Sequence, residues 1–314
     1  MTRAALIPYA IKGWELWNST EKWLHSSIGT RKVNGLSLAF TEEEEELLYE
    51  RVQARQDMGA PIKLISGKKA QRLEPGLNNS VRSAAWCAKD GFTSAYLTGQ
   101  AFKRALTQEN SAVMEYSKVK GIENDKNNFK IYLENNEHLI AKRIVLAGGV
   151  WLEDMLSWLN VKIPIKCLIN QLIITERMPQ VMKTVLSIAN GLLSLKQFDN
   201  GTVLIGGGWQ GLGDKERGGV EAIPENLKGN IRLACHVIPE LCYGRMVRVW
   251  LGLEAETADA LPIIGNVPEI SNAYVIGSVH SGYTSGPYMG WLLSQFIMGQ
   301  ETEMSLFDPS RLIN

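Results

Sequence analysis

The residues whose types could do chemistry gather in a glycine- and serine-rich turn near the end of the chain. It runs from Gly277 to Gly282 and follows a short apolar run, 273–276, whose composition is typical of a strand. Its hydrogen-bonding side chains are those of Ser278, His280, Ser281 and, just beyond the turn, Thr284. Because glycine has no side chain, such a backbone can lie close to a flat ligand. The turn therefore predicts a site for a planar small molecule.

Other chemistries are poorly supported by the sequence. Ser281 follows His280, but adjacency alone does not form a nucleophile and its base. Neither an HExxH pattern nor a P-loop occurs, so metalloprotease and NTPase activities are not indicated. An ordinary loop remains the alternative to a binding site for each of these turn residues.

A second glycine-rich turn ends an apolar run in the middle of the chain. Residues 144–146 read as a short strand, and Ala147, Gly148 and Gly149 follow directly. Small residues at a strand end allow a ligand to approach the backbone, and Trp151 is expected to pack over this turn. These four residues are candidate ligand contacts.

The sequence contains one literal GxGxxG, at Gly206–Gly211, and its surroundings do not suit a phosphate site. The strand-like residues 202–205 precede it, but a charged, glycine-rich loop follows instead of an apolar helix. We therefore interpret it as a strand end and a loop. No strand–GxGxxG–helix unit opens the sequence.

The overall composition is that of an ordinary globular protein. Of 314 residues, 45% are hydrophobic and 21% are charged, and 33 Lys and Arg balance 33 Asp and Glu. No overall field then favours nucleic acid or an acidic membrane, so a small molecule or another protein is the expected partner. We find no membrane span or signal peptide pattern. The four cysteines lack the paired spacing of a zinc site or a disulfide framework, which fits a reducing cytoplasm.

The elements around these turns alternate between helix and strand. Thr41, followed by five glutamates, predicts a solvated helix that ends by Gly59. A second helix is expected over Ile223–Ile238, with Pro224 in its first turn. The tryptophans at 14, 17 and 23 lie near a helical period and predict a packed N-terminal helix, and an apolar helix is expected from about Tyr288 to Met298. Strands are expected at 112–116, 119–123, 129–134, 144–147, 247–253 and 273–276, and across 162–208. The pattern predicts a mixed α/β or α+β chain of two intertwined domains.

Several blocks together resemble the FAD-dependent oxidoreductases of the D-amino acid oxidase type, nearest to the branch that holds glycine oxidase and the sarcosine oxidase β-subunit. They are Glu74–Leu77, Asp90–Gly91, Ile144–Trp151, Gly201–Gly207, Gly252–Leu253, Asp259, a turn at Pro262–Gly265, Gly277, Gly282, Pro287 and Gly290. The resemblance implies FAD as cofactor and oxidation of a C–N bond in an amine or amino acid. It also implies an incomplete Rossmann-like FAD-binding domain (1–32, 93–160 and 250–314) intertwined with an antiparallel-sheet substrate domain (33–92 and 161–249).

The resemblance also assigns roles to individual residues. The segment Ser278–Thr284, namely Ser278, Val279, His280, Ser281, Gly282, Tyr283 and Thr284, would line the flavin ring and the ribityl chain. Val119 would lie beside adenine, although a core valine would look identical in the sequence. His280 stands where glycine oxidases carry an arginine near the substrate, and an ordinary hydrogen-bonded loop histidine is the alternative. No catalytic residue and no metal ligand is identified.

Two departures from the family pattern bear on function. Glu254 replaces the arginine that would hold a substrate carboxylate, so it either favours a cationic amine or forms a structural ion pair, for example with Arg248. The mononucleotide-binding unit that should precede the first long helix is not found in the sequence. A truncated gene model, a separate subunit that supplies the unit, and a degenerate, non-catalytic paralogue are the open explanations.

Overall fold

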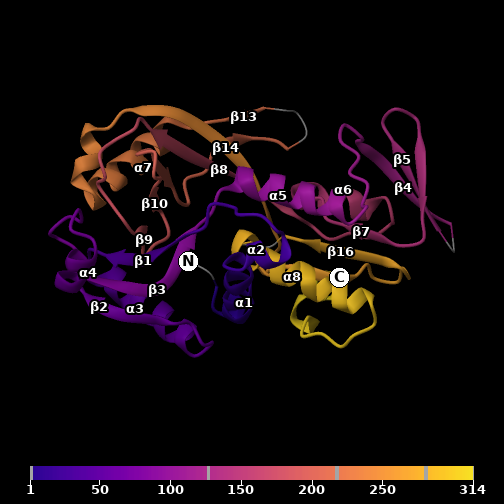
Figure 1. The fold of residues 1–314 in the computed structure, drawn as a ribbon, viewed down its shortest axis with the longest axis horizontal. Coiled ribbons are helices and arrows are strands. Elements are labelled where there is room, and N and C mark those ends of the chain that lie inside the picture. The colour runs from indigo at the N-terminus through magenta and orange to yellow at the C-terminus, as the bar shows by residue number, and fades with distance from the viewer. Residues whose placement is uncertain (1–2, 126–127, 216–218, 279–281, 314) are drawn as a thin grey trace. The chain divides into compact units, whose positions relative to one another are not determined.

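The computed structural model describes residues 3–125, 128–215, 219–278 and 282–313, and the chain forms two compact units (Figure 1). Unit 1 comprises Met1–Ile11, Gly29–Ser94 and Ile169–Leu253. Unit 2 comprises Lys12–Ile28, Ala95–Leu168 and Glu254–Asn314. Helix α1 (Ile7–Trp17) passes from the first unit to the second. Each unit is thus assembled from three separate stretches of sequence.

Unit 1 is organised around an eight-stranded sheet. Its strand order is β14-β8-β11-β10-β9-β1-β3-β2. The strands are β1 (Arg31–Ala39), β2 (Ile62–Ser66), β3 (Ser83–Phe92), β8 (Lys166–Thr175), β9 (Val185–Ile188), β10 (Ser194–Gln197), β11 (Val203–Gly206) and β14 (Met246–Glu256). β1 runs parallel to β9 and antiparallel to β3. A two-stranded ribbon, β12 (Leu212–Gly213) and β13 (Val220–Glu221), follows β11 in the chain.

Helices cover both faces of this sheet. Leucines and isoleucines from one face of β1, β9, β10 and β11 form the main core with α4 (Gly67–Leu73) and α7 (Pro224–Val237). On the other face, α3 (Glu42–Gln56) packs Leu48 and Val52 against Ala39, Ala85 and Ala189. Because both faces are covered, the consecutive residues Gly35–Ala39 of β1 are all buried.

Local signals account for where these helices begin. The Thr41 hydroxyl accepts a hydrogen bond from the Glu44 amide, and Glu44 in turn accepts one from the Phe40 amide. Pro224 occupies the first turn of α7, where its missing N–H costs no helical bond. Both predicted helices are therefore confirmed.

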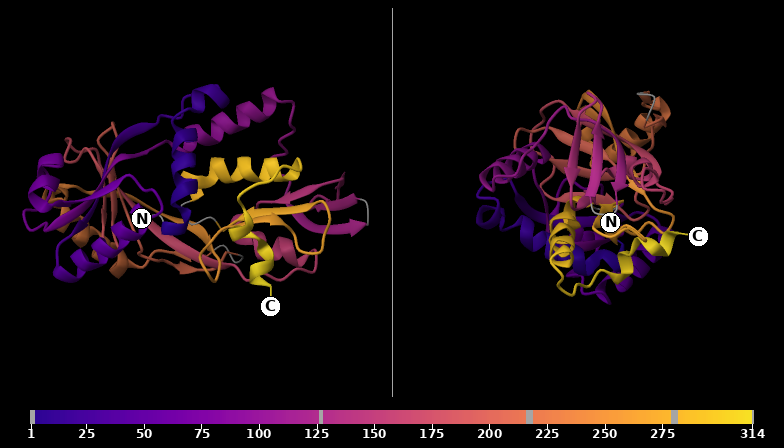
Figure 2. Two further views of the ribbon diagram at one scale, coloured as in Figure 1. Left: turned by 90° about the horizontal axis from the view of Figure 1, so that it is seen from below. Right: turned by 90° about the vertical axis from the view of Figure 1, so that its right-hand side faces the viewer.

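Unit 2 contains two three-stranded sheets and several helices. β15 (Ile263–Asn266), β16 (Ala273–Gly277) and β7 (Ile144–Leu146) form one sheet in the order β15-β16-β7. β4 (Val119–Asp125), β5 (Asn128–Leu133) and β6 (His138–Ala141) form the other. The helices are α2 (Thr20–Trp23), α5 (Ala95–Gln108), α6 (Leu152–Ser157) and α8 (Gly282–Ile297). Figure 2 shows α8, in yellow, along the sheet of β15 and β16.

Three sequence predictions in these regions are wrong. Residues 112–116 form no strand. The expected turn at Pro262–Gly265 contains most of β15, because Ile263 and Ile264 are buried and pair with Gly277 and Ile276. The apolar helix starts at Gly282 and includes Pro287, several residues earlier than predicted.

The other predicted strands and turns are present, with ends shifted by a few residues. The GxGxxG match at Gly206 is the end of β11, and β12 follows it in the chain, as we interpreted it. Asn136, in the turn between β5 and β6, adopts a positive φ of 68°, which asparagine tolerates well. Across the residues that the structure describes, every helix is too short or too polar to cross a bilayer.

Candidate functional site

The two glycine-rich turns predicted as ligand contacts follow two neighbouring strands of one sheet, and these strands run in the same direction. β7 and β16 are parallel, with Ile144 opposite Ala273 and Leu146 opposite Val275. Ala147–Gly149 therefore follow β7 at the same sheet edge where Ser278 follows β16. In sheets of this kind, ligands bind outside the carboxyl ends of parallel strands. The fold thus places these two predicted segments together.

The glycines of these turns serve different purposes. A side chain on Gly148 would collide with the Met155 sulfur, and one on Gly277 would lie 2.7 Å from Leu152 Cδ2. The missing side chains thus leave room for Met155 and Leu152 of α6. Gly149 differs, because it has a φ of 58° and a Cβ there would meet nothing within 4 Å. Its exposed backbone is the part of this turn open to a ligand.

Ser278 combines three unusual properties. Its φ is 52°, a region that serine rarely occupies, and its side chain is 4% exposed. Its Oγ has no hydrogen-bond partner among the residues that the structure describes. Strain and unsatisfied buried groups persist where something else requires them. The hydroxyl is therefore suited to a ligand at the carboxyl end of β16.

The first turn of α8 is fixed by contacts within unit 2. Pro287 has no N–H for the helical bond to the carbonyl of Tyr283, four residues earlier. That carbonyl instead accepts a hydrogen bond from Trp17 Nε1 at 2.6 Å, and the Trp17 and Tyr283 rings stack with centroids 4.9 Å apart. The Tyr283 hydroxyl also shares a hydrogen bond with Thr98. Trp17 thus supplies the donor that proline removes.

Close packing of α1 on α8 adds to this anchoring. A Cβ on Gly13 would collide with the Thr284 carbonyl oxygen and lie 2.9 Å from Ser285 Cα. Glycine at position 13 therefore lets the two helix backbones touch. The sequence indicated that Trp17 packs, but it gave no sign of which helix it packs against. Gly13 and Thr98 were missed altogether.

The remaining predicted site residues lie as follows. Val279, His280 and Ser281 fall outside the described residues. Gly282 and Thr284 are half-buried in the first turn of α8, and Tyr283 is 45% exposed. Trp151 is 50% exposed at the end of a 3-10 turn, Gly149–Trp151. Val119 is half-buried at the start of β4, and Glu254 is half-buried in β14.

Asp259, in the loop before β15, has a structural role. Arg311 donates two hydrogen bonds to its carboxylate, the Leu261 amide donates a third and the Thr257 hydroxyl a fourth. Partial burial raises the pKa of Asp259, but these hydrogen bonds outweigh it and lower the pKa to about 2. The ion pair ties the C-terminal 3-10 turn, Pro309–Leu312, to this loop.

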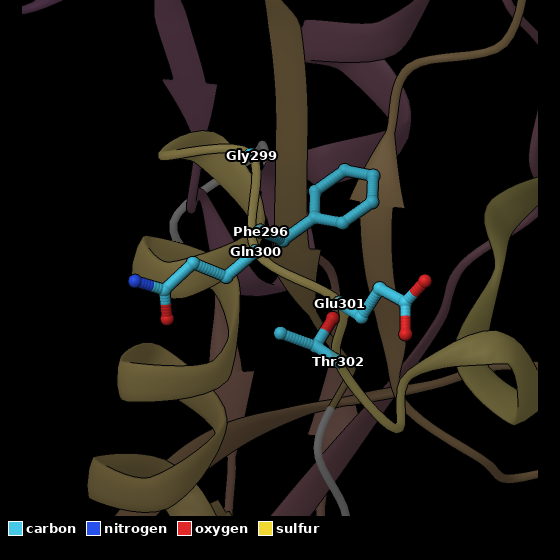
Figure 3. A pocket seen from close by; sticks show the side chains of 5 residues that line it. All are labelled: Phe296, Gly299, Gln300, Glu301 and Thr302. Carbon is cyan, nitrogen blue, oxygen red and sulfur yellow. The ribbon is translucent and has the colours of Figure 1, made fainter.

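A surface hollow in unit 2 lies apart from the two turns. Phe296, Gly299, Gln300, Glu301 and Thr302 line it, at the C-terminal end of α8 (Figure 3). A helix of 16 residues is about 24 Å long, so the hollow lies that far along α8 from the turn that follows β16. It is shallow and lacks ionisable groups other than Glu301.

Proteins of known structure share this architecture. Glycine oxidase from Geobacillus kaustophilus superposes with a TM-score of 0.90 over 100% of this chain and 85% of its own, at 22% sequence identity. In sequence, glycine oxidase from Geobacillus kaustophilus (strain HTA426) is 23% identical over 313 residues, which cover 97% of this chain and 81% of that protein. One of the opine oxidase subunits from Rhizobium meliloti is 25% identical over 292 residues, covering 90% and 75%. The chain thus has the fold of the solved glycine oxidase.

The family model "FAD dependent oxidoreductase" (DAO) matches residues 2–296. The chain therefore belongs to the FAD-dependent oxidoreductases of the DAO family, and the resemblance seen in the sequence is confirmed. Members are enzymes that use FAD. The carboxyl ends of β7 and β16 fit such a cofactor, because they offer the open backbone of Gly149 and the Ser278 hydroxyl, which no other described residue binds.

Proposed function

We propose that this protein oxidises the C–N bond of an amine or an amino acid, with FAD bound at the carboxyl ends of β7 and β16. The observation that carries the proposal is the parallel pairing of these strands, which brings the turn containing Gly149 and the buried hydroxyl of Ser278 to the same edge of one sheet. Support for the substrate class comes from the relatives, since both glycine and opines contain a C–N bond next to a carboxylate. FAD, when bound, accepts the hydride from the carbon that bears the amine.

In this proposal the chain's own residues bind the cofactor and orient it. Ser278 offers its hydroxyl and Gly149 its backbone to the cofactor. Trp17 and Gly13 hold the first turn of α8 in place. Val119, Trp151 and residues 279–281 remain proposed cofactor contacts, and Glu254 and His280 remain proposed substrate contacts.

We further propose that the cofactor's pyrophosphate is bound by a glycine-rich strand–turn–helix unit that is not part of residues 1–314. The only GxGxxG in this sequence is the end of β11, in unit 1, with the β12–β13 ribbon after it. The opine oxidase relative is by its name one subunit of an assembly, which supports a separate chain as the source. A non-catalytic protein that only binds a partner is the alternative function.

A flavin titration tests the proposal. The protein is purified, mixed with FAD and then, without oxygen, with glycine, sarcosine, L-proline or methylamine, while absorbance is followed near 450 nm. We expect bound flavin to lose this absorbance with at least one donor. Replacing Gly149 with valine should weaken FAD binding, whereas Gly99→Ala, on the open surface of α5, should not. A flavin-loaded protein that no amine reduces would favour the non-catalytic alternative.

A further inference from the structure

β6 is an edge strand of the small sheet β4-β5-β6 in unit 2. The amide of Leu133 donates a hydrogen bond of 2.9 Å to the carbonyl of Glu137, so these two residues form a hydrogen-bonded pair of the β5–β6 ladder. Hydrogen-bonded and non-hydrogen-bonded pairs alternate along an antiparallel ladder. The backbone groups of His138 and Ile140 therefore point away from β5. No strand among the described residues pairs with this outer edge.

The two edges of this sheet differ in how they are protected. Natural edge strands avoid pairing with other chains by means of charged side chains and β-bulges. β4 has both, because its ladder with β5 is irregular between Val119 and Gly121 and the strand contains Lys120. β6 has neither, since it contains no Asp, Glu, Lys or Arg and its register with β5 is regular. Leu139 and Ile140 of β6 are 40% and 68% exposed, so this apolar edge is suited to pairing with a further strand.

Charges of opposite sign flank the outer edge of β6. Glu137 precedes the strand, and Lys142 and Arg143 follow it; all three side chains are exposed. The Asn135 side chain donates a hydrogen bond of 2.9 Å to the Glu137 carboxylate, which holds it at this end of the strand. If two β6 strands pair antiparallel, the acidic end of each lies beside the basic end of the other. A parallel pair would bring like charges together, so the edge is self-complementary in charge only when antiparallel.

The hydrogen-bonding pattern limits the register of such a pair. Only alternate residues, among them His138 and Ile140, present their backbone groups outward, and each must meet an outward-facing residue of the other copy. A pair centred on Ile140 meets this condition. It also sets Glu137 opposite Arg143, because each lies three residues from the centre. Opposite charges directly across a ladder stabilise it, and like charges destabilise it.

We propose that two copies of this chain associate through β6, which pairs antiparallel with its own copy about a two-fold axis at Ile140. The two three-stranded sheets then form one continuous sheet in the order β4-β5-β6-β6-β5-β4. The pairing uses both β6 edges, so association through them stops at a dimer. Because each strand has only four residues, the contact buries less than about 1,200 Å², which is typical of reversible complexes. The inference goes beyond the proposed function and does not depend on flavin.

Sedimentation velocity of the full chain, over a range of concentrations, tests for the dimer. Wild type should change from monomer to dimer as its concentration rises. Ile140→Lys should keep the chain monomeric, because two ammonium groups would then meet at the axis. The Ile140 side chain is mostly exposed, so the monomer should tolerate this change, and equal melting temperatures would show that it does.

A charge swap tests the antiparallel register. Arg143→Glu sets two glutamates opposite each other at both ends of the pair and should weaken the dimer at least ~10-fold. Glu137→Arg should weaken it in the same way. The double variant restores opposite charges and should recover most of the affinity. Lys63→Glu is the control: it lies exposed on β2 and changes the net charge as Arg143→Glu does, and it should dimerise as wild type does.

A cross-link gives a readout that does not depend on charge. Ile140→Cys would place two cysteines directly opposite each other, with Cα atoms about 5.5 Å apart, which is within reach of a disulfide. Mild oxidation should then give a covalent dimer on a non-reducing gel, above the background that the four native cysteines give in wild type. Leu64→Cys is the control, because Leu64 is 44% exposed on another edge strand, β2. It should not cross-link above that background.

Three results would each overturn the inference. The first is a wild-type chain that stays monomeric at every concentration. The second is a dimer that Ile140→Lys leaves intact, since the contact must then lie elsewhere. The third is a double charge-swap variant that dimerises no better than either single variant, because the acidic and basic ends are then not opposite each other.

Discussion

The hydrogen bond from Trp17 to the Tyr283 carbonyl makes a prediction about two residues at once. The carbonyl lacks its helical donor because residue 287 is proline, and Trp17 Nε1 replaces that donor at 2.6 Å. Trp17→Phe removes the N–H and keeps an aromatic ring. Leaving a partly buried carbonyl unsatisfied costs about 1–2 kcal/mol. The smaller ring adds a packing loss that depends on the pocket around it.

A second substitution, Pro287→Ala, separates the cost of the lost hydrogen bond from the packing loss. Alanine restores a backbone N–H, which can donate to the Tyr283 carbonyl in the usual helical geometry. In that background Trp17→Phe should cost only the packing loss. The coupling free energy between the two substitutions should therefore be about 1 kcal/mol. The packing loss cancels in the double-mutant cycle, since it is common to both backgrounds.

Urea unfolding of the four proteins, followed by circular dichroism at 222 nm, measures the coupling. Tryptophan fluorescence is avoided because one substitution changes the reporter. The urea concentration at the unfolding midpoint should be well below that of wild type for Trp17→Phe. When Pro287→Ala is present, Trp17→Phe should lower this midpoint by less. If Trp17→Phe costs the same in both backgrounds within about 0.3 kcal/mol, the replacement of the helical donor by Trp17 is refuted.

Four further substitutions test other features of the fold. Gly13→Ala should lower the melting temperature, because overpacking against the α8 backbone costs about 1–3 kcal/mol, which exceeds the helix-propensity gain of about 1 kcal/mol. Gly99→Ala is the matched control: it has open space around it, so the same gain in helix propensity should raise the melting temperature. The pKa of Asp259 is about 2 in the folded chain and about 3.9 unfolded, so its stabilisation is complete above pH ~4 and lost as the pH falls toward 2. Because the Asp259 side chain is partly exposed, we expect its ionised form to stabilise the fold by about 1 kcal/mol. In urea titrations, Asp259→Asn should therefore be less stable than wild type at pH 6 but equal to it near pH 2. Glu74→Ala should lose about 3 kcal/mol in urea unfolding, because it leaves the amides of residues 183 and 184 and the Thr184 hydroxyl without their buried acceptor.

The sequence predicted helices and strands well where the residues that determine them lie within the same element. The Thr41 cap and Pro224 each act within one helical turn, and both helices begin where these residues indicate. Pro262 and Gly265 read as a turn, yet pairing with β16 and burial of two isoleucines make most of that segment a strand. Glycine and proline also argue against helix at 282–287. There Trp17, about 270 residues away, supplies the missing donor, and no local pattern records it.

The candidate site shows the same limit. The composition of the two glycine-rich turns was sufficient to choose them, but only the parallel register of β7 and β16 places them at one sheet edge. The sequence also could not separate Gly148, whose missing side chain makes room for Met155, from Gly149, which faces open space.

The division of the chain into three segments per unit has a consequence for synthesis on the ribosome. The backbone passes from one unit to the other at 11/12, 28/29, 94/95, 168/169 and 253/254. Unit 1 cannot be completed until residue 253 has left the exit tunnel, and unit 2 must wait for its last segment, 254–314. β1 and β3 will emerge long before β9 and β10, so the half-built sheet must be shielded in the meantime. Nascent chains of this protein should therefore depend on chaperones more than a protein of equal length whose domains follow one another along the chain.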